Sequence, residues 1–404
     1  MTNQENAIHR TFISGNDAVA YGVQLCRPEV IASYPITPQT TVVEKLSELV
    51  ANGELDCQYF NVESEHSAMA ATMGAAMTGC RTFTATSSQG LLYMCEMLNY
   101  VSGSRFPIVM MNANRTIAAP WNIYGDHRDS MAMRDSGWMQ VYVEDGQEAL
   151  DSIIQAYKLA ENCDVSTPVM VCVDGFVLTH TYELVKVPKQ EEVDAFLPKY
   201  TPTDNILDLD HPRGLCISVS PEWQTEFRYQ QYKAMEKAKE IIPAIDQKFN
   251  KAFGRFYGGL IEAYKCDDAE YVLVGLGSVT GTMKIVADSL REEGIKAGVL
   301  KIRFYRPFPN EAIQNIIKNQ KGKVHIKAIG VIDKAVSFGN HGPVYSDVKA
   351  ALSGFLFPKL NFIAGLSGRD IKKEDIKEMY QKLICVSHGE ETTEIQFTGL
   401  RWKE

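Results

Sequence analysis

Short apolar runs and helical patterns alternate through the first 180 residues. The apolar runs have the length of β-strands and cover residues 30–36, 57–62, 82–86, 107–112, 140–143 and 168–173. Between them, apolar positions recur with helical spacing in residues 14–26, 40–50, 64–80, 89–101 and 147–162. Strands of a parallel sheet are buried on both faces and are joined by helical crossovers. The pattern therefore predicts an α/β domain with a parallel sheet over residues 1–180.

This alternation stops between residues 181 and 255. Prolines punctuate the segment, and its long helical pattern, over residues 223–251, is rich in charge. We predict a linker segment with one charged helix. A second α/β domain is expected over residues 256–404, with strands at 271–274, 297–302, 328–333 and 359–363 and helices at 281–293, 310–318 and 344–352.

The composition narrows the range of partners. The formal net charge is −9 and no basic run with interleaved aromatic residues occurs, so we expect neither nucleic-acid nor anionic-membrane binding. The N-terminus is polar and no apolar stretch is long enough to span a bilayer, which points to the cytoplasm. The nine cysteines are scattered and none forms a Cys-x-x-Cys pair, so we expect no metal or iron–sulfur site within this chain.

Two prolines around a threonine end the first predicted strand, in the segment Tyr-Pro-Ile-Thr-Pro-Gln-Thr at residues 34–40. Proline fixes φ and pushes the preceding residue toward extended geometry, so we expect a rigid elbow. Ligands bind at the carboxyl ends of strands in open α/β sheets, which makes this elbow a candidate site. A helix start is the alternative that the spacing favours, with Thr37 as N-cap and Pro38 at the first helical position.

Two acidic residues, Glu63 and Glu65, lie between a predicted strand and a helix rich in alanine and glycine. A first-turn acid after a Ser64 cap is a common structural arrangement, because it complements the helix dipole. The functional alternative is a buried carboxylate that exchanges a proton or a hydrogen bond with a cofactor ring. The residues alone do not separate these interpretations.

Arg115 ends another predicted strand and is followed by a long loop over residues 116–129. Loops of this length in a compact domain are more often functional than not. Arg115 could bind a carboxylate through two parallel hydrogen bonds, or it could be an exposed arginine paired with a nearby aspartate. The histidines His127, His180 and His341 have no partners at metal-ligand spacing and stay unassigned.

Six motifs together resemble the α subunit of the multi-subunit 2-oxoacid:ferredoxin oxidoreductases, most closely the pyruvate:ferredoxin oxidoreductases (pyruvate synthases). They are Tyr-Pro-Ile-Thr-Pro at 34–38, Glu-Ser-Glu-His-Ser-Ala at 63–68, Thr-Ser-Ser-Gln-Gly at 86–90, Arg115, the segment 126–131 and Gly-Leu-Ser-Gly-Arg-Asp at 365–370. The resemblance covers essentially the whole chain. It implies a thiamine diphosphate pyrimidine-binding domain followed by a transketolase-C-like α/β domain.

The same resemblance implies that other chains complete the enzyme. The family's diphosphate-binding domain carries a Gly-Asp-Gly motif, which this chain lacks together with the cluster cysteines. Thiamine diphosphate would be shared with a diphosphate-binding β subunit, while Mg²⁺ and [4Fe-4S] clusters would lie in partner subunits that include γ and a ferredoxin-like δ. Coenzyme A would be a co-substrate, and ferredoxin or a similar carrier would receive the electrons.

Three residues of this chain align with the family's functional positions. Glu65 corresponds to the glutamate that hydrogen-bonds the aminopyrimidine, where a carboxylic acid favours the imino tautomer that removes the C2 proton of the thiazolium. Thr37 and Arg115 correspond to the residues that hold the substrate carboxylate. The implied reaction is the reversible oxidative decarboxylation of pyruvate to acetyl-CoA and CO₂.

Other functions stay open. A relative with another substrate would act on a branched-chain 2-oxoacid, 2-oxoglutarate, phenylglyoxylate or oxalate. The β subunit of a lipoamide-linked 2-oxoacid dehydrogenase shares the same two-domain plan and also lacks the diphosphate motif. A scaffold subunit that has lost its chemistry is the alternative that is not an enzyme.

Overall fold

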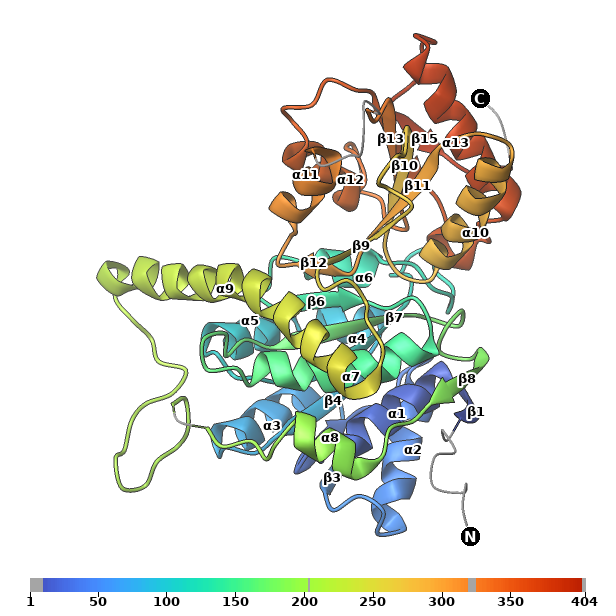
Figure 1. The fold of residues 1–404 in the computed structure, drawn as a ribbon. Coiled ribbons are helices and arrows are strands. Elements are labelled where there is room, and N and C mark those ends of the chain that lie inside the picture. The colour runs from blue at the N-terminus through green and yellow to red at the C-terminus, as the bar shows by residue number, and fades with distance from the viewer. Residues whose placement is uncertain (1–9, 203, 319–324, 402–404) are drawn as a thin grey trace.

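Two largely parallel β-sheets organise the chain, in a computed structural model that describes residues 10–202, 204–318 and 325–401 (Figure 1). The first sheet has seven strands. In spatial order they are β12 (Phe304–Arg306), β6 (Met139–Tyr142), β7 (Val169–Asp174), β5 (Val109–Asn114), β4 (Thr82–Thr86), β2 (Val30–Ser33) and β3 (Gln58–Asn61). All pairings are parallel except that of β12 with β6.

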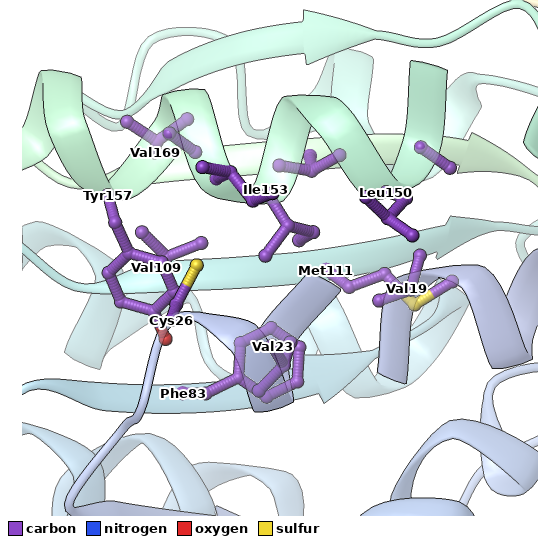
Figure 2. Packing of buried hydrophobic residues seen from close by; sticks show 14 of the residues in the cluster. Val19, Val23, Cys26, Phe83, Val109, Met111, Leu150, Ile153, Tyr157 and Val169 are labelled. Atoms are coloured by element: carbon purple, nitrogen blue, oxygen red, sulfur yellow. The ribbon is translucent and has the colours of Figure 1, made fainter. Parts of the chain in front are cut away.

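Helices cover both faces of this sheet because successive side chains of its buried strands point to opposite faces. In β5, Val109 and Met111 pack with α1 (Gly15–Leu25), α2 (Thr40–Ala51) and α7 (Gly146–Ala160), whereas Met110 packs on the other side. Figure 2 shows Ile153 and Val23 of the first layer above β5 and β4. The opposite layer consists of α3 (Glu65–Met77), α4 (Ser88–Tyr93) and α5 (Cys95–Gly103).

The second sheet has six strands. In spatial order they are β15 (Ile395–Phe397), β14 (Lys359–Ile363), β13 (Ala328–Asp333), β10 (Tyr271–Gly275), β11 (Ala297–Ile302) and β9 (Ile261–Tyr264), of which only β9 is antiparallel to its neighbour among these described strands. One face packs on α10 (Val279–Glu292) and α13 (Lys373–Ser387), and the other on α11 (Asn310–Lys318) and α12 (Pro343–Ala351).

The segment between the sheets contains the long helix α9 (Pro221–Phe253), which projects from the body of the molecule (Figure 1). Its buried residues all lie from Ala234 onward, where Phe249 and Phe253 pack against Phe196 of α8 (Gln190–Phe196). The first three turns are exposed to solvent, including Trp223.

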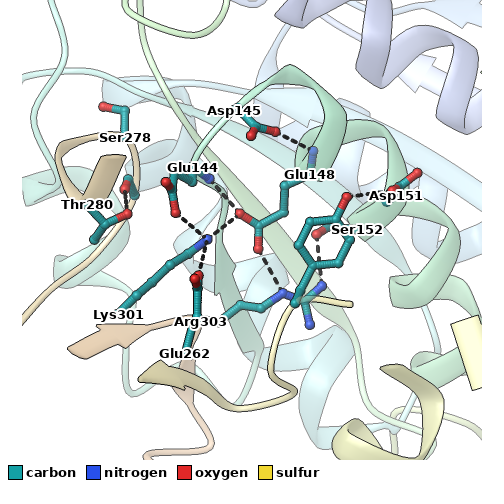
Figure 3. Close-up of polar contacts among 12 residues, drawn as sticks. Glu144, Asp145, Glu148, Asp151, Ser152, Glu262, Ser278, Thr280, Lys301 and Arg303 are labelled. Carbon is teal, nitrogen blue, oxygen red and sulfur yellow. Dashed lines mark hydrogen bonds and ion pairs between the residues drawn. The ribbon is translucent and has the colours of Figure 1, made fainter. Parts of the chain in front are cut away.

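A buried ionic cluster joins the two sheets. Glu148 of α7 accepts hydrogen bonds from Lys301 Nζ (2.6 Å) and Arg303 Nε (2.9 Å), at the end of β11 (Figure 3). These three side chains are almost inaccessible to water. Glu144 adds a further contact to Lys301 at 3.0 Å. Charges this deeply buried persist only where they are paired, so the cluster fixes how the two sheets meet.

The fold class predicted from the sequence is confirmed, and so are the expected strands of both sheets and the charged helix. The expected helix over 89–101 consists of α4 and α5, which are separated by Met94. Further elements were not expected: β9, β12, β15, α8, α13, the short helix α6 (Arg128–Ala132) and a two-stranded antiparallel ribbon of β1 (Arg10–Ser14) and β8 (Tyr182–Lys186). The domain boundaries at residues 180 and 255 stay predictions.

Candidate active site

The predicted site residues meet at one edge of the seven-stranded sheet. The strands β2, β4 and β5 are parallel neighbours, so the segments that follow them leave the sheet on the same side. Thr37 follows β2, the start of α4 at Ser88 follows β4, and Arg115 follows β5. Glu65 starts α3 after β3, the next strand of the sheet.

Thr37 lies in a hydrogen-bonded turn before α2, so the expected N-cap role is wrong. The helix starts at Thr40 and its N-cap is Gln39, because the Gln39 backbone N–H donates to the carbonyl of Ile36 (2.9 Å) and closes a separate turn first. The Gln39 side chain donates to the carbonyl of Tyr34 (2.9 Å), and Asn16 donates to that of Pro38 (2.8 Å). The elbow is thus held on two sides.

Arg115 is buried with 6% of its surface exposed, which contradicts the alternative of an exposed arginine paired with an aspartate. Its Nη1 donates to the Thr37 carbonyl (2.7 Å) and its Nη2 to Gln89 Oε1 (2.8 Å). Its Nε has no hydrogen-bond partner in the part of the chain that the structure describes. Burial lowers the pKa of the guanidinium, and the charges of Asp129 and Glu65 oppose that effect.

Glu65 is the first residue of α3 and is 8% exposed. Ser64 caps the helix by accepting a hydrogen bond from the Ser67 backbone N–H (3.2 Å), so the expected structural arrangement is present. Glu63 is exposed and accepts a hydrogen bond from the Ser67 hydroxyl. The Glu65 carboxylate has no hydrogen-bond partner among the residues that the structure describes.

Glu65 and Thr86 pack closely against the backbone of Gly90. A Cβ atom on Gly90 would lie 2.6 Å from both Glu65 Oε1 and Thr86 Oγ1, closer than real Cβ contacts allow. The Thr86 hydroxyl is also buried and has no hydrogen-bond partner among the described residues. Buried polar groups almost always find partners, so these neighbouring unpaired groups fit a polar ligand. Glu65 is a suitable residue to bind the aminopyrimidine ring of thiamine diphosphate.

Asp129 is a buried acceptor that fixes the strand ends, and the sequence did not assign it a role. Its carboxylate accepts hydrogen bonds from the backbone N–H groups of Ser88 (3.0 Å) and Arg115 (3.1 Å) and from the side chains of Asn112 and Asn114. Burial raises the pKa of this carboxyl, which the hydrogen bonds partly offset. Its place at the end of the long loop over residues 116–129 was the available signal.

A second unassigned cluster connects the two sheets beside this site. His127 contacts Asp174 Oδ1 (2.6 Å), and Lys334 and Ser278 bind Asp174 Oδ2 at 3.0 and 2.9 Å. Burial would raise the pKa of Asp174, but Lys334 and His127 hold it well below its usual range. Asp174 ends a buried strand, and its position directly after an apolar run was the signal available in the sequence. His180 and His341 do not join this cluster.

Two family profiles cover most of the chain. The one described as "Pyruvate flavodoxin/ferredoxin oxidoreductase, thiamine diP-bdg" matches residues 21–247. This chain belongs to that family. The one described as "Pyruvate:ferredoxin oxidoreductase core domain II" matches residues 269–376.

Curated relatives of this family member match it along nearly their whole length. Pyruvate synthase subunit PorA of Methanocaldococcus jannaschii is 53% identical over 90% of this chain and 92% of its own. Ketoisovalerate oxidoreductase subunit VorA of Pyrococcus horikoshii is 44% identical over 96% of this chain and 98% of its own.

Two solved structures have a similar fold. A 2-oxoglutarate:ferredoxin oxidoreductase from Magnetococcus marinus, solved with 2-oxoglutarate, coenzyme A and succinyl-CoA, has a TM-score of 0.69 at 20% identity over 93% of this chain and 65% of that one. A split-gene transketolase, described as an inactive β4 tetramer, has a TM-score of 0.54 at 15% identity over 93% of this chain and 100% of that one.

The comparisons confirm the predicted family and the predicted enzyme class, an oxidoreductase of the 2-oxoacid:ferredoxin type. The similarity to transketolase agrees with the predicted fold class. None of the described helices is long and apolar enough to cross a membrane. Within the described ranges, no three metal-ligating side chains converge. The roles of Glu65, Thr37 and Arg115 stay predictions.

Proposed function

We propose that this chain is the α subunit of a pyruvate:ferredoxin oxidoreductase, which converts pyruvate and coenzyme A to acetyl-CoA and CO₂ and passes two electrons to ferredoxin or a similar carrier. The observation that carries the proposal is the buried Glu65 carboxylate, which has no hydrogen-bond partner among the described residues. The PorA relatives support pyruvate as the substrate.

Glu65 would bind the aminopyrimidine ring and exchange a proton with its N1′ atom. When bound, thiamine diphosphate supplies a nucleophilic carbon and an electron sink for the loss of CO₂. A carboxyl group that binds the ring needs no protein hydrogen-bond partner, and the Glu65 carboxylate has none among the described residues.

Arg115 and Thr37 would bind the carboxylate of the 2-oxoacid. Arg115 presents a guanidinium whose Nε is still unpaired, and Thr37 supplies a hydroxyl at the exposed elbow. Because this carboxylate leaves as CO₂, Arg115 would hold the reactant and release the product.

The remaining components of the enzyme would lie in other subunits. We propose that Mg²⁺ and the diphosphate are bound by a β subunit and that γ and ferredoxin-like δ subunits carry [4Fe-4S] clusters, because this chain has no Gly-Asp-Gly motif and no cluster-ligand spacing. A cytoplasmic location belongs to the same proposal, and it agrees with nine cysteines that form no disulfide bond among the described residues.

A branched-chain 2-oxoacid is the second candidate substrate, because VorA relatives are 43–46% identical to this chain. The test is viologen reduction by the complex that copurifies with this chain, with and without coenzyme A, on pyruvate, 2-oxobutyrate, 2-oxoisovalerate, 2-oxoglutarate, phenylglyoxylate and oxalate. We expect a coenzyme A-dependent rate that is highest on pyruvate. A maximum on 2-oxoisovalerate would move the assignment to the VorA type, and no reduction with any acid would reject the oxidoreductase.

A further inference from the structure

Gln89 is placed between the two groups that the proposed function uses, and no role has been assigned to it so far. It lies in the first turn of α4, which follows β4, directly before Gly90. Gly90 borders the Glu65 carboxylate, while the Gln89 side chain reaches the Arg115 guanidinium. The first turn of α4 therefore contacts both the candidate acid and the candidate carboxylate-binding residue.

The chemistry of arginine fixes which way the Gln89 amide faces. A guanidinium only donates hydrogen bonds, so the atom 2.8 Å from Arg115 Nη2 is the amide oxygen Oε1. The Ser88 hydroxyl contacts the same oxygen. The carbonyl of Thr37, 2.7 Å from Nη1, is the other acceptor that holds the guanidinium.

Both of these acceptors are neutral. Within the described part of the chain, no carboxylate forms an ion pair with the Arg115 side chain, and Asp129 binds the Arg115 backbone instead. The Trp121 ring also covers the guanidinium, with its centroid 5.6 Å from Arg115 Cζ. An aromatic ring is uncharged, so this contact does not neutralise the positive charge. The guanidinium is thus immobilised while its full positive charge stays available to an anion.

The position of Gln89 is itself fixed by its neighbour. Ser88 has φ +51°, in the left-handed region that non-glycine residues rarely adopt. The Asp129 carboxylate holds this residue by accepting its backbone N–H at 3.0 Å. Strained residues of this kind cluster at ligand sites, where the surrounding structure over-determines them.

We propose that Gln89 is a positioning residue for Arg115 and thereby sets the affinity of the enzyme for the carboxylate of its 2-oxoacid, an inference that rests on the proposed function. Gln89 holds Nη2 with a neutral oxygen, which keeps the guanidinium in place without neutralising it.

Two isosteric variants test this role in the assembled complex. Gln89→Met keeps the shape of the side chain and removes the oxygen, so Arg115 loses one of its two acceptors. We expect KM for the 2-oxoacid to rise by about 3- to 10-fold, the effect of one ordinary hydrogen bond, with kcat changed by less than about 2-fold. Gln89→Glu keeps the hydrogen bond but pairs the guanidinium with a carboxylate. We expect a larger rise in KM, about 10-fold or more, because the substrate must then compete with an internal anion.

A chemical readout separates this inference from the proposed function. Phenylglyoxal modifies accessible guanidinium groups, and peptide mass mapping reports its rate at Arg115 in the complex without substrate. We expect faster modification of Arg115 in Gln89→Met than in the wild type. Gln381→Ala, which replaces an exposed glutamine of α13, is the matched control and leaves both KM and the modification rate unchanged.

The outcomes are distinguishable. Wild-type KM and an unchanged Arg115 modification rate in both Gln89 variants would overturn the inference and leave the proposed function standing. Faster modification with an unchanged KM would also overturn it, because Gln89 would then hold an arginine that does not bind substrate. A KM that rises equally in Gln89→Met and Gln89→Glu, with lower thermal stability in both, would indicate a merely structural role and would reject it as well.

Discussion

Glu65 and Glu63 are two residues apart, but their carboxylates have opposite surroundings. Glu65 is buried without a protein partner, whereas Glu63 is exposed and binds the Ser67 hydroxyl. We predict that Glu65→Gln lowers kcat for 2-oxoacid-dependent viologen reduction by about 100-fold or more, the range of lost general acid–base catalysis. Glu63→Gln is the control and changes kcat by less than about 2-fold. Full turnover by Glu65→Gln would favour the scaffold alternative.

Gly90 gives a second prediction at the same site. We expect Gly90→Ala to abolish most of the activity, because the added methyl group would lie 2.6 Å from Glu65 Oε1 and Thr86 Oγ1 and would displace both side chains. Gly74→Ala in α3 meets nothing within 4 Å and stabilises the helix by up to about 1 kcal/mol. Activity and melting temperature are measured for both complexes. Equal activities would show that the position of the Glu65 carboxylate against Gly90 does not matter for the reaction.

Individual site residues were predictable where they end a strand. Thr37, Glu65 and Arg115 follow strands that the apolar pattern had already located, and parallel strands bring their ends together. Gln89 and Asp129 were not predictable in this way, because their roles depend on contacts with Arg115 and Ser88 across separate loops. The N-cap assigned to Thr37 was wrong because a turn closed by Gln39 precedes the helix.

The N-terminus of α7 makes the stability of this helix dependent on pH. Asp145 caps α7 by accepting a hydrogen bond from the Glu148 backbone N–H (2.7 Å). Burial, with further contributions from Glu148 and Glu183, raises the pKa of Asp145 from 3.8 to about 6. Between these two values the folded protein binds a proton that the unfolded chain has released. The free energy of unfolding therefore falls as the pH rises through this window.

We predict that Asp145→Asn removes this fall in the free energy of unfolding at rising pH, because the amide oxygen still caps the helix but carries no charge. The variant should gain stability relative to the wild type as the pH rises from 4 to 6.5, by about 3 kcal/mol at most for a shift of this size. Melting temperatures across this range measure the difference. Asp164→Asn, at an exposed position after the same helix, is the control. Parallel melting curves for Asp145→Asn and the wild type would contradict the prediction.

Helices and strands were predictable from the sequence where their burial requires apolar residues at regular positions. The strands that the sequence predicted are apolar runs, and all of them are present. The ribbon of β1 and β8 has no such pattern, since Phe12, Tyr182 and Leu184 face solvent and the two strands are held by pairing between distant segments. Helix α13 was missed although Ile376, Met379, Tyr380 and Leu383 recur with helical spacing.

At the scale of the whole molecule, Glu148 is the residue on which the joint between the sheets depends. We predict that Glu148→Gln destabilises the protein by about 3–5 kcal/mol. Lys301 and Arg303 would stay buried and charged but would lose the carboxylate that pairs with both of them. Denaturant midpoints and melting temperatures of the complex measure the change. Glu391→Gln, at an exposed position, should leave both unchanged. A wild-type midpoint for Glu148→Gln would mean that Glu144 alone neutralises the cluster.

The pairing of β12 with β6 determines the order in which the chain can complete its fold during synthesis. Residues 139–142 leave the ribosome long before residues 304–306, so the nascent chain presents β6 as an open edge throughout that interval. Unpaired strand edges bind other chains and promote aggregation. A fragment that stops at residue 255 would keep this edge permanently, and it is therefore expected to aggregate when it is expressed alone, whereas the full chain supplies its own protective strand.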